Sequence, residues 1–585
     1  MGPGRLEQHY LQLLATFPRR SVVTTLQVLA DTLGCSRRHM RTLVIKMAQQ
    51  QWLSWHSTAG RGHMGTLTLH RTEQEMMLLK AEQYLRGNDI NNALKLVGNN
   101  PQHITRLLRS RLGHSIQDDQ QSLCIPYYRS MPNLCPGTPL RRSEMYLVKQ
   151  IFSGLTKTEE THGQVVGDLA HHWRQLDPCR WRFYLRPGVL FHDGSELTSN
   201  DVASSLMRSA TLPLFSHIKK VSPGASRCVE ITLSHPDPHL PLLLSDVGAL
   251  ILPADHARRM EFARYPVGSG PYKVVDNNDW HLHLRAFSGY FGLRGLLDNI
   301  EILTGFDFSD PATQTSPLAW LSSSVRDLDY TNGETRHVTG TPGDASPNMF
   351  LERGGYFILC DSRSPHWQQA GTRRWLRTLL DPGDIVQQFV KPVRPLWSPA
   401  NSLLPGWFHL MDQGVDPVAP VLSGPAAGRL RLACHAEHPE FPMLISAFSR
   451  IFSAAGITLE LTELDYQDWA HGNAEADLWL GTVNFYPPEV WNTGSWLLGM
   501  PLLRYGITGG DGALLDQWQQ QWREGVLPSE QLAARIIQSG WLQPLFHHWM
   551  RINSPDQAQG IQLNNLGWFD FSKTWLEPED NGGRV

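Results

Sequence analysis

The sequence has few of the features that mark secreted or membrane proteins. Its seven cysteines are an odd number without a Cys-x-x-Cys pair, which argues against a disulfide framework and favours a reducing compartment. The first twenty residues hold no long apolar run behind a basic start, so we expect no secretory signal. The most apolar later stretch, Leu240 to Leu252, is short and broken by Asp246. We therefore expect a cytoplasmic protein with no membrane partner.

Patterns typical of catalysis, cofactors and metal ions are equally scarce. The pairs His171-His172 and His547-His548 would point opposite ways on a strand and lie about 100° apart on a helix, so neither pair predicts a metal site. The segment Gly268-Ser269-Gly270-Pro271 lacks both the Lys of a phosphate loop and the third glycine of a dinucleotide fingerprint. His192-Asp193-Gly194 is more typical of a turn than of a catalytic pair. The sequence predicts no enzyme, no cofactor and no metal.

The positive charge of the chain is concentrated near its start. Residues 1–70 contain eight Lys or Arg and two acidic residues, a net charge of +6, whereas the whole chain of 585 residues carries −3 and the remainder therefore −9. Cations gathered in one small unit of an otherwise acidic protein are what contact with phosphate requires. Enough apolar residues follow for several hydrophobic cores, and the length predicts three or four domain-sized units.

The basic unit has the pattern of a winged helix-turn-helix. Two apolar stripes at helical spacing predict two short helices, one through Leu26, Leu29, Ala30 and Leu33 and the next through Met40, Leu43, Val44 and Met47. Gly34 can end the first helix, and Ser36 can cap the second. Alternating residues at 52–55 and 66–69 predict strands around a glycine-rich tip. We expect an α+β winged helix over residues 1–70, with the helix-turn-helix at about 26–49.

The second helix predicts the contacts with double-stranded DNA. Arg38 and Arg41 can each place a fork of donors on guanine, while Thr42 and Ile45 can meet a thymine methyl or the backbone. The flanking cations are expected to hold phosphate, and the wing adds two residues at its tip. The expected DNA-binding set is Ser36, Arg37, Arg38, His39, Arg41, Thr42, Ile45, Lys46, Arg61 and His63. The alternative is an ordinary solvated basic face.

Residues 71–115 predict polar, helical structure interrupted at Gly87-Asn88 and at Gly98-Asn99-Asn100-Pro101. This segment is either a connector that packs onto the winged helix or a plain spacer. From about residue 120 the pattern changes to short strands, turns and helices. Trp181, Phe183 and Leu185 alternate as in a strand, and the segment Thr198 to Asp201 has the spacing of a helix start.

Several segments in order resemble the family 5 extracellular solute-binding proteins: Gly163 to Ala170, Trp181 to Gly194, Pro266 to Tyr272, Ala286 to Gly292 with Leu297 to Ile300, and Arg429 to Leu461. The resemblance implies a two-lobed α/β fold of the periplasmic-binding-protein type (type II) over residues 116–585, with the ligand buried between the lobes. It places lobe one at about 116–340 and 545–585, and lobe two at about 341–544.

The combination of the two parts is more specific than either part. With Cys35 to Leu43 in the helix, Ala59 to Gly62 in the wing and Asn565 to Phe571 near the end, the chain resembles the SgrR-type transcriptional regulators over its full length. That resemblance implies a regulator that binds promoter operators, activates a small-RNA gene under sugar-phosphate stress and represses its own transcription. It also implies a small-molecule effector, a phosphorylated sugar. The oligomeric state is left open.

The ligand site is less clearly marked. Oligopeptide-binding relatives use an acidic residue in a Trp-x-x-Asp-Tyr segment, whereas here Thr482 and Phe485 stand at the tryptophan and acid positions, which argues against a peptide. Arginine and aromatic side chains suit an anionic sugar instead. The expected ligand-binding residues are Arg141, Arg142, Arg353, Asn484, Tyr486 and Trp491. The alternatives are a transport-type solute-binding protein, which would need export, and a hydrolase, which would need a catalytic cluster.

Overall fold

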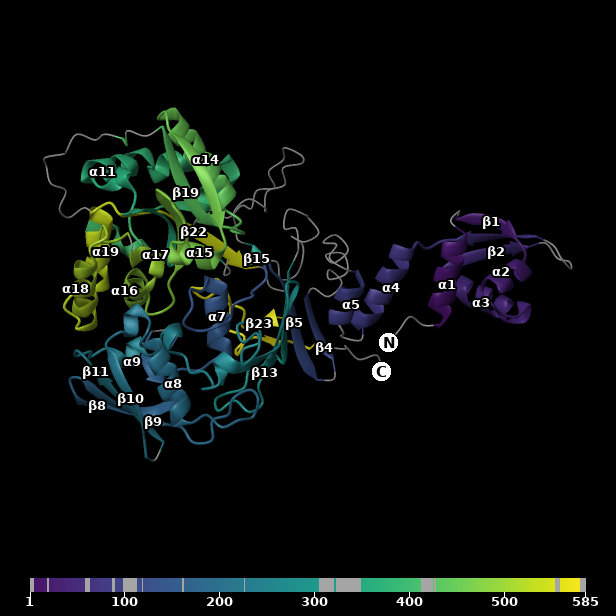
Figure 1. Ribbon diagram of the computed structural model, residues 1–585, viewed down its shortest axis with the longest axis horizontal. Coiled ribbons are helices and arrows are strands. Elements are labelled where there is room, and N and C mark those ends of the chain that lie inside the picture. Colours follow the sequence, from purple (N-terminus) through teal and green to yellow (C-terminus); the bar gives the residue numbers. More distant parts are fainter. Residues whose placement is uncertain are drawn as a thin grey trace. The chain divides into compact units, whose positions relative to one another are not determined.

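Two compact units make up the chain, Met1–Arg111 and Leu112–Val585 (Figure 1). The computed structural model describes residues 5–17, 20–57, 64–86, 90–97, 113–117, 119–159, 163–225, 227–304, 320–321, 349–411, 424–425, 428–504, 506–552 and 558–578. In these ranges no helix combines the length and the apolar character needed to cross a bilayer.

The first unit is a winged helix followed by two further helices. Its three antiparallel strands pair in the order β1-β3-β2. The elements are α1 (Arg5–Thr16), β1 (Ser21–Thr24), α2 (Leu26–Thr32), α3 (Arg37–Gln49), β2 (Leu53–Ser57), β3 (Gly65–Leu69), α4 (Glu73–Arg86) and α5 (Ile90–Val97). The predicted helix-turn-helix and both predicted wing strands are confirmed.

Burial of the two apolar stripes explains why α2 and α3 pack together. Leu29, Ala30 and Leu33 from the first stripe and all four residues of the second lie in one core. The Ser36 hydroxyl accepts a hydrogen bond from the His39 N–H at 3.2 Å and so caps α3. Gly34 has φ +59°, the left-handed conformation that a helix end favours. The turn between the helices is therefore set by local sequence.

Lobe one of the second unit contains a five-stranded sheet in the order β12-β13-β14-β5-β4. Its strands and the helix beside it are β4 (Gly113–Gln117), β5 (Gln120–Pro126), α7 (Arg142–Ile151), β12 (Tyr272–Asn277), β13 (His281–Ala286) and β14 (Asn299–Leu303). The C-terminal segment packs here, because Trp568 stacks on Tyr146 at 5.7 Å and Phe569 lies in the same core. Short elements complete the lobe: β6 (Thr156–Thr158), β7 (Val165–Gly167), α9 (Leu240–Leu243), β23 (Ala558–Gln559) and β24 (Trp575–Leu576).

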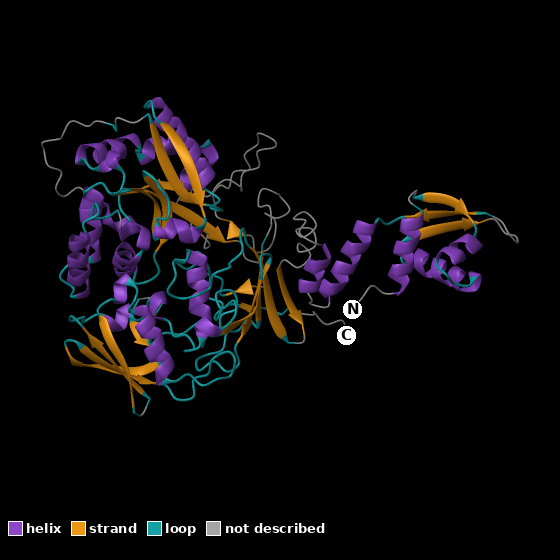
Figure 2. Ribbon diagram, in the orientation of Figure 1, coloured by secondary structure: helices purple, strands orange, loops and turns teal. Residues whose placement is uncertain are grey.

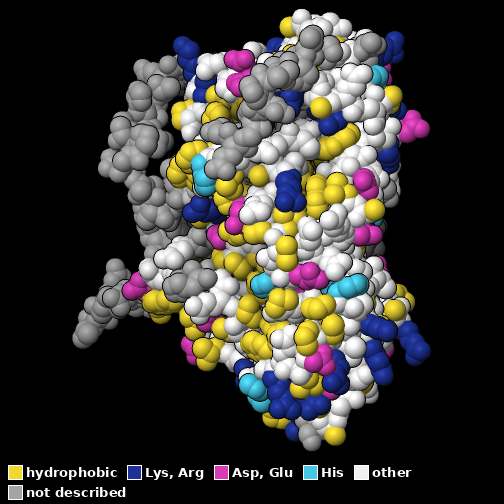
Figure 3. All heavy atoms as spheres, turned by 90° about the vertical axis from the view of Figure 1, so that its left-hand side faces the viewer, with side chains coloured by type: hydrophobic (Ala, Val, Ile, Leu, Met, Phe, Trp, Pro, Cys, Tyr) yellow, Lys and Arg dark blue, Asp and Glu magenta, His cyan; other side chains and the backbone are white. Residues whose placement is uncertain are grey.

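A four-stranded antiparallel sheet forms the other part of lobe one. Its order is β10-β11-β9-β8, and α8 packs against β10 and β11. The bounds are β8 (Ala170–Asp177), β9 (Arg180–Leu185), α8 (Ser199–Ser209), β10 (Ile218–Gly224) and β11 (Cys228–Leu233). Trp181, Phe183 and Leu185 face the core as predicted, and the Asp201 carboxylate accepts from the Thr198 N–H at 2.9 Å. Lys and Arg side chains gather at the height of this sheet in Figure 3.

Lobe two is built on an eight-stranded mixed sheet with helices on both faces (Figure 2). β17 shows why both faces are covered, since Phe357 and Leu359 enter one core while Tyr356, Ile358 and Cys360 enter another. The strands are β15 (Trp320–Leu321), β16 (Met349–Leu351), β17 (Gly354–Cys360), β18 (Trp397–Pro399), β19 (Arg429–His435), β20 (Thr458–Leu464), β21 (Leu478–Asn484) and β22 (Leu542–Ile552). The helices are α11 (Ala370–Leu379), α12 (Pro382–Gln387), α13 (Phe408–Met411), α14 (Phe441–Ala454), α15 (Tyr466–His471), α16 (Glu489–Gly499), α17 (Pro501–Arg504), α18 (Gly512–Arg523) and α19 (Ser529–Gln538).

One expected lobe boundary differs from the structure. The resemblance places residues 545–585 in lobe one, but β22 pairs with β17, β18 and β16 in the sheet of lobe two. The chain therefore returns to lobe one only after residue 552. The sequence could not assign β22 to a lobe, because its apolar residues fit the core of either one. Only its pairing with other strands decides the lobe to which it belongs.

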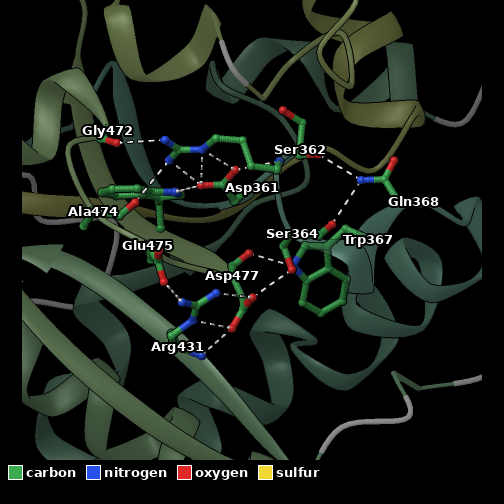
Figure 4. Close-up of polar contacts among 12 residues, drawn as sticks. Asp361, Ser362, Ser364, Trp367, Gln368, Arg431, Gly472, Ala474, Glu475 and Asp477 are labelled. Atoms are coloured by element: carbon green, nitrogen blue, oxygen red, sulfur yellow. Dashed lines mark hydrogen bonds and ion pairs between the residues drawn. The ribbon is translucent and has the colours of Figure 1, made fainter.

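A network of buried polar groups ties β17, β19 and β21 together at one end of this sheet (Figure 4). The Asp477 carboxylate, 3% exposed, accepts from the Ser364 hydroxyl at 2.8 Å and from the Arg431 backbone N–H at 2.8 Å. Asp361 accepts from the Trp479 ring N–H at 2.9 Å and from Arg363. Arg363 also donates to the carbonyl of Gly472 at 3.1 Å. The network positions the loop between α15 and β21.

Replacing Asp477 by alanine is expected to lower the free energy of unfolding by about 1–3 kcal/mol, because buried donors on Ser364 and Arg431 lose their acceptor. Chemical denaturation followed by circular dichroism measures the loss. Glu475→Ala is a matched control, since Glu475 pairs with the same Arg431 at 2.9 Å but is 89% exposed, and about 0–1 kcal/mol is expected. Equal losses in both variants would contradict the assignment of stability to the buried network.

Candidate functional site

The outer face of α3 carries the residues predicted to bind DNA. Arg37, Arg38, His39, Arg41 and Lys46 are all exposed, while the residues between them at helical spacing are buried. None of these five side chains forms an ion pair within the described residues. Their charges are therefore available to phosphate and to base edges.

Two polar contacts and one apolar residue refine this face. The Thr42 hydroxyl donates to the Arg38 carbonyl at 3.3 Å, so its methyl group is the part left for a thymine. Ile45 is 50% exposed on the same helix, so its side chain is accessible to a thymine methyl or to the DNA backbone. Ser36 is occupied as the helix cap. The predicted wing residues Arg61 and His63 lie outside the described residues.

The second candidate site is a cavity of about 260 Å³ between the two lobes of the solute-binding-like unit. Lobe one contributes the start of α7 and the loop before it, the 3-10 helix Pro213–Phe215 and the segment 246–248. Lobe two contributes the end of β21 and parts of α15 and α16. Aromatic side chains form much of the lining: Tyr128, Phe215, Tyr466, Trp469, Phe485, Tyr486 and Trp496. Such walls can stack on a ring, and the polar groups among them can fix its orientation.

Four of the six predicted ligand residues line this cavity, namely Arg141, Arg142, Asn484 and Tyr486. The other two are not brought there. Trp491 stacks on Trp522 with ring centroids 4.1 Å apart, and Arg353 is exposed in the turn before β17. Both residues are close in sequence to lining residues, but their side chains point away from the cavity.

A buried ion pair joins the lobes beside the cavity. The Arg142 guanidinium donates to the Glu352 carboxylate at 3.0 Å, and Glu352 is 2% exposed. Burial raises the pKa of Glu352 to about 7, although Arg142 and the nearby Asn484 amide lower it. The Asn484 Nδ2 and the Glu352 Oε2 are buried and reach no partner at hydrogen-bonding geometry. Of these two residues Asn484 lines the cavity, so its amide is the polar group that a ligand can contact.

The two other arginines of the cavity differ in how far their charges are neutralised. Arg129 makes a bidentate pair with the buried carboxylate of Glu144. Arg141 lies over the Tyr466 ring at 5.0 Å and 3.4 Å from Glu437, whose side chain is 60% exposed. Arg141 is thus the lining arginine whose charge is least neutralised by a buried partner, and it is the best placed to bind an anion.

Sequence reasoning missed several lining residues. Asp246 accepts from the Gly248 N–H at 2.8 Å and from the Ser495 hydroxyl at 3.3 Å, and burial raises its pKa. Its position as the break in an apolar stretch was a usable signal. Burial lowers the pKa values of His435 and His438, and His438 lies 3.0 Å from the Glu440 carboxylate. Nothing in the local sequence marks these two.

The lobes also meet directly around the cavity. The Tyr466 hydroxyl donates to the Leu140 carbonyl at 3.2 Å, and the Gln467 amide donates to the Pro139 carbonyl at 2.8 Å. On another side, Arg523 of α18 donates to the carbonyls of Pro213 and Leu214 at 2.7 and 2.8 Å. Hydrogen bonds between the lobes therefore flank the cavity on two sides.

The other motifs have structural roles. His192 accepts from the Gly268 N–H at 3.2 Å, and its second ring nitrogen lies 3.0 Å from the Gly270 carbonyl oxygen, so the ring buttresses a turn. Burial lowers its pKa to about 4. Across the described ranges, no three His, Cys, Asp or Glu side chains come together as metal ligands would.

Comparison with known proteins covers both units. Residues 5–119 match the family model described as "Sugar transport-related sRNA regulator N-term", and residues 164–337 match the middle region of family 5 bacterial extracellular solute-binding proteins. Among solved structures, the Escherichia coli murein tripeptide binding protein MppA has a TM-score of 0.60 at 14% identity over 79% of this chain and 99% of its own. Burkholderia pseudomallei OppA has a TM-score of 0.60 at 13% identity over 79% and 100%. These likenesses confirm the two-lobed fold.

Two curated relatives match nearly the whole chain. The HTH-type transcriptional regulator SgrR of Pectobacterium atrosepticum is 38% identical over 99% of this chain and 100% of its own length. The SgrR of Yersinia enterocolitica is 36% identical over the same shares. With a winged helix that exposes a basic recognition helix and a two-lobed solute-binding fold behind it, the chain belongs to the SgrR family of HTH-type transcriptional regulators.

Proposed function

We propose that the protein reads promoter DNA through α3 and adjusts that binding to a small molecule held between its lobes. The observation that carries the proposal is the pairing of two sites in one chain. One is a helix whose exposed cations have no ion-pair partner in the described residues. The other is an aromatic-lined cavity between the lobes that includes the buried amide of Asn484. The protein then acts as a cytoplasmic binding protein and regulator, not as an enzyme.

The finer features follow from family membership. We infer that the chain activates a small-RNA gene under sugar-phosphate stress and represses its own transcription, as the SgrR-type resemblance implies. A phosphorylated sugar suits the cavity, because Arg141 can meet the phosphate while the Tyr486 or Trp496 ring stacks on the sugar. The Asn484 Nδ2 then finds an acceptor in a sugar hydroxyl or phosphate oxygen.

Control of DNA binding by the effector requires that the effector binds the open and the closed form with different affinities. A ligand shifts an equilibrium between open and closed lobes only by the ratio of its affinities for the two forms. Ligand contacts that involve both lobes exist only in the closed form and so supply that difference. The hydrogen bonds between the lobes add to the stability of the closed form itself. DNA binding responds if the open and closed forms differ in how well they support α3 on its operator.

The proposal is tested with purified full-length protein and a labelled fragment of the DNA upstream of its own gene. Mobility shifts are measured over a salt series, with and without glucose 6-phosphate, and with glucose as the uncharged control. We expect binding that prefers this fragment over scrambled DNA, weakens steeply with salt and changes with the phosphorylated sugar alone. Absence of a preference for the upstream fragment would contradict the DNA-binding part. A preference that neither sugar alters would contradict the choice of effector.

A further inference from the structure

The solvent face of the four-stranded sheet in lobe one carries cations in register across its strands. Arg174 on β8 lies opposite Arg182 on β9, and Arg182 lies opposite Glu230 on β11. In the next row, Arg180 and Lys220 flank Thr232 from the two sides. Lys219 and Lys220 are both exposed at a bulge of β10. We call this surface the basic sheet face, made of Arg174, Arg180, Arg182, Lys219 and Lys220.

Only part of this charge is neutralised. Arg180 pairs with Asp177 at 2.5 Å, and Arg182 pairs with Glu230 at 3.0 Å. Within the described residues, Arg174, Lys219 and Lys220 have no carboxylate within ion-pairing distance. The face therefore keeps a net positive charge of about three, which Figure 3 shows as the gathering of Lys and Arg side chains.

The net charge of the basic sheet face is opposite in sign to the net charge of the unit that carries it. Residues 112–585 contain 37 Lys or Arg and 49 Asp or Glu, a net charge of −12, whereas residues 1–111 contain 15 and 6, a net charge of +9. An ordinary solvated surface mixes both signs. Arg174 directly opposite Arg182 is also a like-charge cross-strand pair, which costs stability unless an anion lies over it.

The shape of the face suits an extended polyanion. Four strands spaced about 4.8 Å apart span about 14 Å, over which duplex DNA carries about eight phosphate charges. No catalytic or ligand-binding residue interrupts this face among its described positions, and Tyr184 stacks on His172 at 5.8 Å beside the arginines. The surface thus offers charge without a pocket, as contact with a nucleic-acid backbone requires.

We infer that the basic sheet face binds the phosphate backbone of the DNA that flanks the operator. The inference rests on the proposed function, because α3 must first hold the chain on DNA. Once it does, the flanking duplex is present at a high effective concentration, so contacts too weak to act alone add to the overall affinity. Such contacts carry no base preference, and they add phosphates to the salt dependence.

The test uses full-length protein with the triple variant Arg174→Glu, Lys219→Glu, Lys220→Glu. On a long fragment with flanking duplex on both sides of the operator, we expect about 10- to 100-fold weaker binding and a salt slope reduced by about 3. On a short fragment limited to the operator, the variant and the unaltered protein should bind alike. The charge-neutral variant Arg174→Gln, Lys219→Gln, Lys220→Gln should show a smaller loss of the same kind.

The matched control reverses three exposed cations elsewhere in the same unit, Arg258→Glu, Arg285→Glu and Lys391→Glu. It changes net charge equally, so an equal loss of affinity would overturn the inference in favour of a general charge effect. An unchanged salt slope in the face variants, with operator preference intact, would also overturn it while leaving the proposed function standing. Loss of binding to single-stranded RNA without loss on DNA would reassign the face to RNA. If the unaltered protein prefers no fragment, the proposed function itself has failed.

Discussion

Replacing Arg38 by alanine is expected to weaken binding to the operator by about 5- to 150-fold and to leave binding to scrambled DNA nearly unchanged. A bidentate arginine contact with guanine is worth about 1–3 kcal/mol of discrimination against other bases. Arg38 is exposed on α3 and has no ion-pair partner within the described residues, so the free protein loses no internal interaction. Competition mobility shifts with cognate and scrambled duplexes measure the change.

Lys46 supplies the matched comparison on the same helix. It lies near the C-terminal end of α3, where we expect a phosphate contact. Lys46→Ala should weaken both duplexes by a similar factor and lower the salt slope by about 0.9. Equal losses on cognate and scrambled DNA for both variants would contradict the division of α3 into base-reading and phosphate-binding residues.

Replacing Glu352 by glutamine is expected to remove a pH dependence of stability worth about 3 kcal/mol. Burial raises the pKa of this carboxyl from 4.5 to about 7, and each pKa unit corresponds to about 1.4 kcal/mol. Between these pH values the folded protein keeps a proton that the unfolded chain has lost. The contribution of Glu352 therefore falls as the pH rises from about 4.5 to about 7, and a glutamine has no such loss.

Because other charged and titratable groups surround Glu352, its effect must be measured as the difference in stability between the variant and the unaltered protein. Arg142, Glu440 and the buried His548 all face this region, and the lowered pKa of His548, about 4, gives the opposite slope between that pH and 6.5. These groups are present in both proteins and largely cancel in the comparison. Denaturant unfolding at pH 5, 6, 7 and 8 should show the variant gaining stability relative to the unaltered protein as pH rises. The exposed Glu463→Gln control should show no trend.

A flat difference between the Glu352→Gln variant and the unaltered protein would mean that the carboxyl is ionised throughout this range. The Arg142 pair would then offset its burial. A slope of the expected sign would instead mark the pair as a weak contact that a ligand can replace.

The winged helix was predictable because its information is local. Spacing alone identified the buried stripe of α3. Gly34 marked the end of α2 because glycine readily adopts a left-handed backbone, and Ser36 marked the start of α3 because its hydroxyl can cap a helix. Arg38 lies opposite that stripe and Lys46 flanks it, so both could be named as exposed from sequence. The alternation of apolar and polar residues predicted β9, and the capping residues Thr198 and Asp201 predicted the start of α8, because these signals are also local.

The cavity was less predictable because its walls come from segments hundreds of residues apart. Arg142 and Glu352 are 210 positions apart and meet only when the lobes close. His435 ends β19 and His438 follows it, and neither position has a distinctive local pattern. Asp246 interrupts an apolar stretch, but the sequence does not show what it faces. Arg353 and Trp491 had suitable chemistry but point elsewhere, since one residue along a strand or helix changes the face on which a side chain lies.

By itself, the sequence determined the winged helix, the orientation of its basic helix and the family of the two-lobed body, because periodicity, capping and ordered motifs are written in neighbouring residues. Tertiary structure alone decided that β22 belongs to lobe two, which charges pair across the lobes, and which cations share one sheet face. Those features depend on strand register and lobe contacts. Such contacts join distant parts of the chain, and no local pattern encodes them.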